Sequence, residues 1–272
     1  MSIGILRNNN FKFNKKFGQN FIFDQNFLDS IVVNNVTKED EVLEIGAGAG
    51  TLTTTLSKHA KRVVSYEIDE NLKPVLSESL EGCSNIELTF KDVMKEKTED
   101  IDNRFDNEYI LFANLPYYIT TPIIFKFLKE SVKLKSMYIM VQKEVADRIC
   151  AKSGGKDYGV LTVSIQSVAD VSIVKKVSRT MFMPIPNVDS AIVKIKLNKD
   201  KLPVGFDLER HFQVVADAFS MRRKTLENNL KKYNNVTTDV SEVLSKCNIK
   251  SGSRAESLKI EDFIKLTSEL VK

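Results

Sequence analysis

The stretch Glu44-Ile45-Gly46-Ala47-Gly48-Ala49-Gly50 overlaps the end of the apolar run Val42–Ile45 and comes directly before a helix candidate at Thr51–Ala60. Glycines between a strand and a helix let a ligand approach the backbone closely, because no side chain stands in the way. The spacing is G-x-G-x-G with an acid just before it, whereas dinucleotide-binding folds use G-x-G-x-x-G. The stretch therefore predicts an α/β fold that binds a small ligand at this turn.

The chain on both sides of this turn alternates between apolar, β-branched runs and amphipathic stretches, from Glu41 to Lys196. Such alternation is typical of a mostly parallel sheet with helices on both faces. The predicted strands are Val42–Ile45, Arg62–Tyr66, Ile86–Phe90, Tyr109–Ala113, Ser136–Val141, Val171–Val177 and Ser190–Leu197. The predicted helices are Asp24–Asn35, Thr51–Ala60, Glu70–Leu80, Pro122–Lys129 and Glu144–Ala151. We therefore predict a Rossmann-like α/β domain, in which the last two strands can pair at the sheet edge.

The composition changes after Leu197. Residues 198–206 form a polar linker with Pro203 and Gly205, and the rest of the chain has only helical patterns. His211–Lys232 places apolar residues on one helical stripe. We predict a catalytic domain at residues 1–198, with a basic N-terminal segment, and a small all-helical domain at residues 199–272.

Acidic residues stand at the ends of three predicted strands, namely Glu44, Glu67 and Asp92. The carboxyl ends of parallel strands meet at one edge of a sheet, where open α/β sheets bind ligands. Glu67 follows the glycine-rich turn at about the separation at which an acid accepts hydrogen bonds from ribose hydroxyls. Glu44 suits a ligand with an ammonium and a sulfonium better than a pyrophosphate. These acids therefore predict an S-adenosyl-L-methionine site, with helix capping as the alternative; Asp69 is predicted to cap the next helix.

Asn114-Leu115-Pro116-Tyr117 follows the apolar run Tyr109–Ala113 and combines an amide, a rigid turn and an aromatic ring. The Asn114 side-chain carbonyl and the Leu115 backbone carbonyl can accept hydrogen bonds from an amino group on a flat ring, because Pro116 fixes the turn. Tyr117 can stack on that ring, and Phe182 can stack on its other face, as in base-modifying enzymes. A plain proline turn and an ordinary core phenylalanine are the alternatives.

The composition disfavours several classes of site. Cys83, Cys150 and Cys247 are far apart in the chain and have no nearby histidine, which argues against disulfides and against a metal site. His59 and His211 are distant from the motifs, so imidazole-based catalysis is not expected. The sequence has neither an apolar run long enough to span a membrane nor a secretory signal, which predicts a cytoplasmic protein without membrane contact.

Positive charge gathers towards both ends of the chain, although the net charge is only +4. Residues 1–20 contain basic residues and no acid, and a second basic run lies in the predicted C-terminal helices. Clustered cations of this kind contact nucleic-acid phosphates, whereas a solvated tail and a bracing role are the alternatives. The predicted RNA-binding residues are Lys12, Lys15, Lys16, Arg222, Arg223 and Lys224.

Taken together, these segments resemble the rRNA adenine N6,N6-dimethyltransferase family, and most closely its bacterial small-subunit (16S rRNA) branch. The resemblance covers nearly the whole chain and rests on Phe17–Phe21, Glu44–Gly50, Asn114–Tyr117, Gln142–Arg148, Lys156–Leu161, Phe182–Ser190, Phe219–Leu230 and Arg254–Leu258. Ile22 stands where the family commonly has Leu, and Ala47 where it often has Pro. Related 23S rRNA methyltransferases share the glycine-rich turn but usually differ across the Arg-Arg-Lys-Thr and Arg-Ala-Glu segments.

The resemblance implies that an S-adenosyl-L-methionine pocket is formed by Asn20, Ile22, Gly46, Glu67, Asp92 and Asn114. The glycine-rich turn itself predicts Glu44 and Gly48 as further cofactor-binding residues. It implies dimethylation of N6 on each of two adjacent adenines near the 3′ end of 16S rRNA, within an immature small ribosomal subunit. We expect a monomer. The alternatives are a 23S rRNA adenine N6-methyltransferase and an assembly factor whose binding matters more than its catalysis.

Overall fold

The computed structural model describes residues 3–14, 18–233 and 239–270. The chain divides into two compact units. The first unit comprises Met1–Ala146 and Ser172–Lys196, and the second comprises Asp147–Val171 and Leu197–Lys272. Each unit has its own apolar core.

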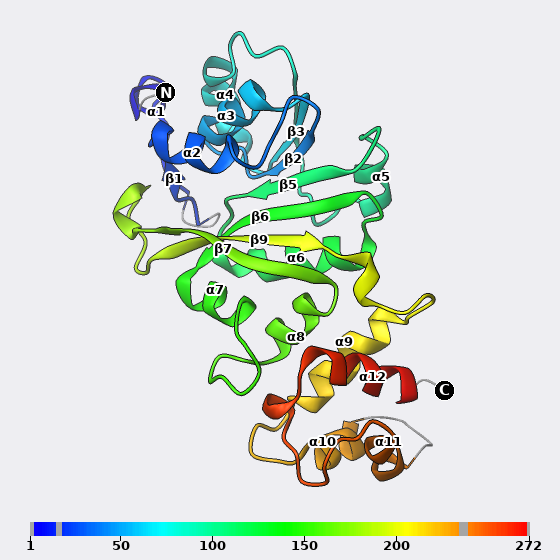
Figure 1. Cartoon of the computed structure of the whole chain (residues 1–272). Helices are drawn as coiled ribbons and strands as arrows, with labels where there is room; N and C mark the ends of the chain where they lie inside the picture. The colour runs from blue at the N-terminus through cyan, green and yellow to red at the C-terminus, as the bar shows by residue number, and fades with distance from the viewer. Residues whose placement is uncertain (1–2, 15–17, 234–238, 271–272) are drawn as a thin grey trace. The chain divides into compact units, whose positions relative to one another are not determined.

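The first unit contains a seven-stranded sheet with the order β4-β3-β2-β5-β6-β9-β7 (Figure 1). Its strands are β2 (Glu41–Ile45), β3 (Arg62–Glu67), β4 (Ile86–Phe90), β5 (Tyr109–Ala113), β6 (Leu134–Gln142), β7 (Ala169–Val177) and β9 (Ser190–Leu197). Pairing is parallel from β4 to β6, and β9 is antiparallel to β6. The predicted strands and the mostly parallel α/β fold are therefore confirmed, and the last two strands are neighbours with β7 at the edge.

Strands β2 and β5 lie in the middle of this sheet, and every residue of both strands is buried. A parallel strand with both faces covered must be apolar on both faces, which explains the near-continuous apolar runs. Val42, Ile110 and Phe112 from these strands join one core cluster with residues of helix α2 (Gln25–Val32). Because neighbouring parallel strands end at the same edge, the loops that follow β2, β3, β4 and β5 are brought together.

The remaining helices of the first unit precede or connect these strands. They are α1 (Ile3–Asn8), α3 (Thr51–His59), α4 (Lys73–Ser79) with the 3-10 turn η2 (Glu70–Leu72) before it, α5 (Thr98–Asp102) and α6 (Tyr117–Glu130). Asp69 caps η2 as predicted, because its side chain accepts a hydrogen bond from the Asn71 amide. Helix α6 begins five residues before the predicted start at Pro122, with Pro116 as its N-cap. The first turn of α6 therefore carries Tyr117.

The second unit is helical and differs from the prediction of a single boundary after residue 198. It contains α8 (Val160–Gln166), α9 (Leu208–Ala218), α10 (Leu226–Tyr233), α11 (Val240–Lys246) and α12 (Ile260–Leu270), and α7 (Lys143–Ile149) lies at the junction. Tyr158 and Val163 precede residue 198, yet they pack in one apolar cluster with Val215 and Phe263. This packing explains why Asp147–Val171 belongs with the C-terminal helices.

The predicted helical stripe His211–Lys232 is wrong as a single helix, because the chain turns between α9 and α10. The amide of Asn229 donates hydrogen bonds to the carbonyls of Ala218 and Met221, and the Lys224 amide donates to the Met221 carbonyl. These bonds satisfy carbonyls that a continuous helix would have paired internally. Residues 222–224 therefore lie in a turn.

No helix among the described residues is both long and apolar enough to cross a membrane. The described residues also contain no group of three or more His, Cys, Asp or Glu side chains that could hold a metal ion.

The buried His211 makes the stability of the second unit depend on pH. Its Nδ1 lies 2.9 Å from Thr267 Oγ1 and its Nε2 lies 2.9 Å from Ser167 Oγ, and burial lowers its pKa from 6.5 to about 4. The neutral ring therefore stabilises the fold above pH 6.5, and this contribution is lost as the pH falls towards 4.

We expect the free energy of unfolding to fall by up to about 3 kcal/mol over this pH range. His211→Gln keeps one amide donor and one acceptor but does not titrate, so its thermal unfolding midpoint should change less with pH. Unfolding midpoints measured from about pH 7 to about pH 4.5 test this, and parallel pH profiles for the two proteins would contradict it.

Candidate functional site

A cavity of about 500 Å³ lies at the carboxyl edge of the sheet in the first unit. This is where open α/β sheets bind ligands, and the volume is within the usual range of about 300–1,000 Å³ for ligand pockets. The loops after four neighbouring strands line it: Ile45–Ala49 after β2, Glu67–Ile68 after β3, Lys91–Lys95 after β4 and Asn114–Ile119 after β5.

The glycine-rich turn forms one wall of the cavity. Gly46 has a φ of +87° and Gly48 a φ of +56°, which is the left-handed region that glycine tolerates best. A Cβ at Gly46 would lie 3.0 Å from Leu115 Cδ2, and a Cβ at Gly48 would lie 3.0 Å from Phe21 Cε1. The turn therefore has to be glycine both for its backbone conformation and for its close packing.

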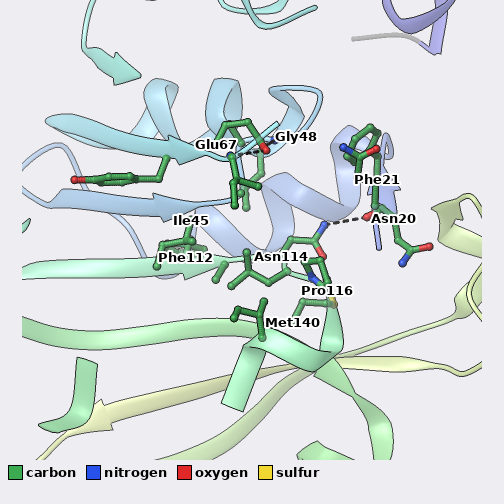
Figure 2. Close-up of a pocket in the computed structure, with 18 of the residues that line it drawn as sticks. Asn20, Phe21, Ile45, Gly48, Glu67, Phe112, Asn114, Pro116 and Met140 are labelled. Atoms are coloured by element: carbon green, nitrogen blue, oxygen red, sulfur yellow. Dashed lines mark hydrogen bonds between the residues drawn. The ribbon is translucent and has the colours of Figure 1, made fainter. Parts of the chain in front are cut away.

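Glu67 holds this turn in place (Figure 2). Its Oε2 accepts a hydrogen bond of 2.8 Å from the Gly48 amide, and its Oε1 accepts bonds of 2.8 Å from the amides of Ile68 and Asp69. The side chain is only 6% exposed, and burial raises its pKa while the three amide bonds oppose that rise. The Glu67 carboxylate therefore lies in the cavity wall as a fixed acceptor.

Asp92 lies at the neighbouring strand end, in the same cavity. Its Oδ1 accepts a hydrogen bond of 3.0 Å from the Met94 amide, which fixes the side chain over the loop after β4. Glu67 and Asp92 are thus brought together as predicted from their positions at successive strand ends.

Asn114 connects the end of β5 to the N-terminal segment (Figure 2). Its Nδ2 donates a hydrogen bond of 3.4 Å to the Asn20 carbonyl, and Asn20 Nδ2 donates one of 3.0 Å to the Gly18 carbonyl. A Cβ at Gly18 would lie 3.0 Å from Pro116 Cβ, so the N-terminal segment packs directly on the proline turn. The Asn114 Nδ2 can only donate hydrogen bonds, so its Oδ1 is the side-chain atom that can accept one from a ligand.

Tyr117 and Phe182 contribute aromatic rings to the cavity. The Tyr117 hydroxyl lies 2.8 Å from Ser190 Oγ at the start of β9, which holds the first turn of α6. Phe182 lies in the short strand β8 (Phe182–Met183), which pairs antiparallel with β1 (Phe21–Ile22) and places Ile22 opposite Phe182. The structure therefore brings together residues that are 65 positions apart in sequence, Tyr117 and Phe182, in the cavity with Asn114.

The N-terminal segment contributes further cavity residues that the prediction of site residues missed, among them Gln19 and Phe21. Gln19 Nε2 donates a hydrogen bond of 2.7 Å to Asp69 Oδ2, and its Oε1 accepts one of 2.9 Å from the Asn14 amide. Phe21 packs against the rings of neighbouring phenylalanines, Phe11, Phe13 and Phe23. Both residues belong to the Phe-Gly-Gln-Asn-Phe motif at residues 17–21, so the signal was present in the sequence.

Glu44 does not line the cavity, contrary to the prediction that it binds the cofactor. Glu44 pairs in register with Ser65 and therefore lies two residues deeper in the sheet than Glu67, the last residue of β3, which does line the cavity. Glu44 is fully buried, accepts a hydrogen bond of 2.6 Å from Ser65 Oγ on β3, and has its pKa raised to about 7 by burial. This carboxyl group supports the sheet behind the glycine-rich turn.

The predicted RNA-binding residues are distributed over both units. Lys12 is exposed in the first unit, and Lys15 and Lys16 lie outside the described residues. Residues 222–224 are exposed in the turn of the second unit, and Arg222 Nη2 donates a hydrogen bond of 3.2 Å to the Lys156 carbonyl. Arg222 therefore has a structural contact as well as an exposed charge.

The sequence profile of a family described as "Ribosomal RNA adenine dimethylase" matches residues 10–272. Among the most similar relatives, "Ribosomal RNA small subunit methyltransferase A" of Bacillus licheniformis is 42% identical over 98% of this chain and 94% of the relative. The protein of the same name from Clostridium acetobutylicum is 42% identical over 98% of this chain and 97% of the relative.

Two solved structures have a similar fold. A dimethyladenosine transferase from Plasmodium falciparum superposes with a TM-score of 0.76 and 28% identity, over 90% of this chain and 95% of that protein. The 23S rRNA methyltransferase ErmE superposes with a TM-score of 0.70 and 27% identity, over 93% of this chain and 100% of that protein.

The close packing at Gly46 can be separated from its backbone strain by a matched pair of variants. Gly46→Ala and Gly82→Ala both place a Cβ at positive φ, which costs about 1–2 kcal/mol. At Gly46 the Cβ would also lie 3.4 Å from the Asn114 carbonyl oxygen, whereas no described atom outside the local chain lies within 4 Å of a Cβ at Gly82.

We expect Gly46→Ala to weaken binding of S-adenosyl-L-methionine by roughly tenfold or more, because the added methyl group displaces the segment that begins at Asn114. Gly82→Ala should lose stability without losing affinity. Calorimetric titration of both variants tests this, and equal affinities would contradict the importance of the close packing.

Proposed function

The chain belongs to the ribosomal RNA adenine dimethylase family, and we propose that it transfers methyl groups from S-adenosyl-L-methionine to adenines of ribosomal RNA. We infer that the targets are two adjacent adenines near the 3′ end of 16S rRNA, each dimethylated at N6. The observation that carries this proposal is the meeting of Asn114–Tyr117 with the glycine-rich turn and Glu67 in one cavity. In that cavity, Asn114–Tyr117 can bind an amino group on a flat ring, and the glycine-rich turn and Glu67 can bind a nucleoside cofactor.

The residues of the cavity fit S-adenosyl-L-methionine. Gly46 and Gly48 line the cavity and have no side chain of their own, so a ligand can approach their backbone, and Glu67 presents a fixed carboxylate for ribose hydroxyls. Asp92 and the backbone around Asn20 complete the set of polar groups. When bound, this cofactor supplies the electrophilic methyl group.

Asn114 has the central role in the proposed chemistry. The lone pair of adenine N6 is delocalised into the ring, so N6 is a weak nucleophile until its hydrogens are drawn out of the ring plane. Asn114 Oδ1 and the Leu115 carbonyl can accept those two hydrogens, and Pro116 keeps the two acceptors in position. Tyr117 and Phe182 hold the adenine ring by stacking. No strong base is needed, because N6 becomes acidic only as the new bond forms, and water can then take the proton.

The relatives support the small-subunit branch over the large-subunit branch. Those at 42% identity are named small-subunit methyltransferases, whereas the 23S rRNA methyltransferase ErmE is 27% identical. The substrate we infer is an immature small ribosomal subunit, on which the protein acts in the cytoplasm as a monomer.

Asn114→Ala tests the proposed chemistry directly. We expect the rate of methyl transfer to fall by roughly two to three orders of magnitude, comparable to losing one hydrogen-bonding group that acts in the transition state. Cofactor affinity should fall much less. Single-turnover rates on small-subunit particles, with mass-spectrometric mapping of the modified adenines, measure this.

A rate within threefold of the parent enzyme would rule out the proposed role of Asn114. An inactive variant that still binds particles and supports their maturation would instead favour an assembly factor. Modification of a 23S rRNA adenine rather than the 16S pair would move the protein to the other branch.

The basic turn of the second unit gives a second test. Among the described residues, the side chains of Arg223 and Lys224 form no hydrogen bond or ion pair, whereas Arg222 donates a hydrogen bond to the Lys156 carbonyl. We expect Arg223→Ala/Lys224→Ala to weaken particle binding and to reduce the slope of log affinity against log salt by up to about two units. Filter binding from low to high salt measures this, with Arg222→Ala as the variant that also loses a structural bond. A stable double variant with an unchanged salt slope would contradict phosphate contact.

A further inference from the structure

Tyr118 is an exposed aromatic residue at the edge of the cavity. Its side chain is 68% exposed, yet it lines the same cavity as Asn114 and Tyr117. Tyr117 and Phe182 are less exposed and belong to the cavity wall, so Tyr118 is the residue of this aromatic group that is open both to the cavity and to solvent.

The backbone beneath Tyr118 is held by several bonds. The residue lies in the first turn of α6, directly after Tyr117, whose hydroxyl lies 2.8 Å from Ser190 Oγ. The Ile119 amide and Thr120 Oγ1 both donate hydrogen bonds to the Pro116 carbonyl, at 3.1 Å and 3.2 Å. A ring on a rigid turn loses little conformational entropy when it binds a second flat ring, because only two side-chain torsions have to be fixed.

An RNA substrate with one base in the cavity would have its next base close to the Tyr118 ring. If one adenine occupies the cavity, the base joined to it through the RNA backbone has to lie just outside. Aromatic side chains bind unpaired bases by stacking, with little dependence on the identity of the base. The exposed ring of Tyr118 has the position and the chemistry for that contact.

We propose that Tyr118 forms a stacking site for the unpaired base adjacent to the target adenine, an inference that rests on the proposed function. The adjacent base is itself the second target, so this site keeps it at the entrance while the first adenine is modified. Tyr118 is a binding residue in this scheme and takes no part in the transfer step. The site would therefore contribute to RNA affinity and to the conversion of both adenines.

The first experiment compares Tyr118→Ala with Tyr118→Phe on small-subunit particles. We expect Tyr118→Ala to raise KM for particles by about tenfold to a hundredfold, the effect of losing one base–aromatic contact. Tyr118→Phe keeps the ring and should restore the parent KM. Cofactor affinity should be unchanged in both variants. Val132→Ala is a matched control, because Val132 is 72% exposed and lies beyond the opposite end of α6.

The second experiment keeps the Tyr118 ring and removes the RNA base that we propose stacks on it. Particles are reconstituted with 16S rRNA in which one of the two adenines is replaced by an abasic nucleotide through ligation of a synthetic 3′ segment. The KM of the parent enzyme for these abasic particles should then be close to the KM of Tyr118→Ala for particles with both adenines. The KM of Tyr118→Ala should rise little further on the abasic particles.

Three outcomes would overturn the proposal. A KM for Tyr118→Ala within threefold of the parent value would show that the ring is not used, and a Tyr118→Phe variant as weak as Tyr118→Ala would show that the hydroxyl is used instead of stacking. If KM rises by the same factor for the parent enzyme and for Tyr118→Ala when the abasic particles replace particles with both adenines, the ring contacts something other than that base. In each of these cases the parent enzyme still methylates adenine, so the proposed function stands; absence of methylation by the parent enzyme would refute both.

Discussion

The parallel pairing of β2 with β3 on one side and with β5 on the other is the constraint on which the site depends. It aligns Ile45 with Tyr66 and with Ala113, so the chain leaves all three strands at one level. The glycine-rich turn, Glu67 and Asn114 follow directly after those positions. No long-range side-chain contact is needed to bring these loops together, because the backbone hydrogen bonds of the sheet already do so.

Close backbone packing then decides which residues can form the cavity wall. Gly18, Gly46 and Gly48 each lie where a Cβ would come within 3.0 Å of another residue. Three segments of the chain, residues 18–21, 45–50 and 114–117, are therefore packed against one another through glycine, proline and aromatic surfaces. Glu67 connects two of the cavity's loops by hydrogen bonds, because its carboxylate accepts from the Gly48 amide in the glycine-rich turn and from the amides of Ile68 and Asp69 in its own loop. A ligand with a ribose would meet a carboxylate that is already held in position.

The two carboxyl groups near the turn differ in their level along the sheet. Glu44 and Glu67 both stand near the ends of neighbouring strands, and both are buried. Glu67 is the last residue of β3 and reaches the cavity, whereas Glu44 pairs in register with Ser65 and so lies two residues deeper in the sheet than Glu67. Because the level of a residue along its strand sets its distance from the carboxyl edge, proximity in sequence to the glycine-rich turn does not decide which carboxyl group reaches the cavity.

The sequence alone determined the α/β class, the seven strands, the glycine-rich turn and the Asn114–Tyr117 motif, because strand periodicity and turn chemistry are local properties. It also indicated Glu67, Asp92 and Phe182 as site residues. The tertiary structure alone decided that Glu44 lies below the cavity within the sheet, that Asp147–Val171 joins the C-terminal helices, and that residues 222–224 form a turn. It also paired β1 with β8 and placed Gln19 on Asp69. These features depend on contacts between segments far apart in the chain. Local patterns of hydrophobicity do not predict which distant segments contact one another.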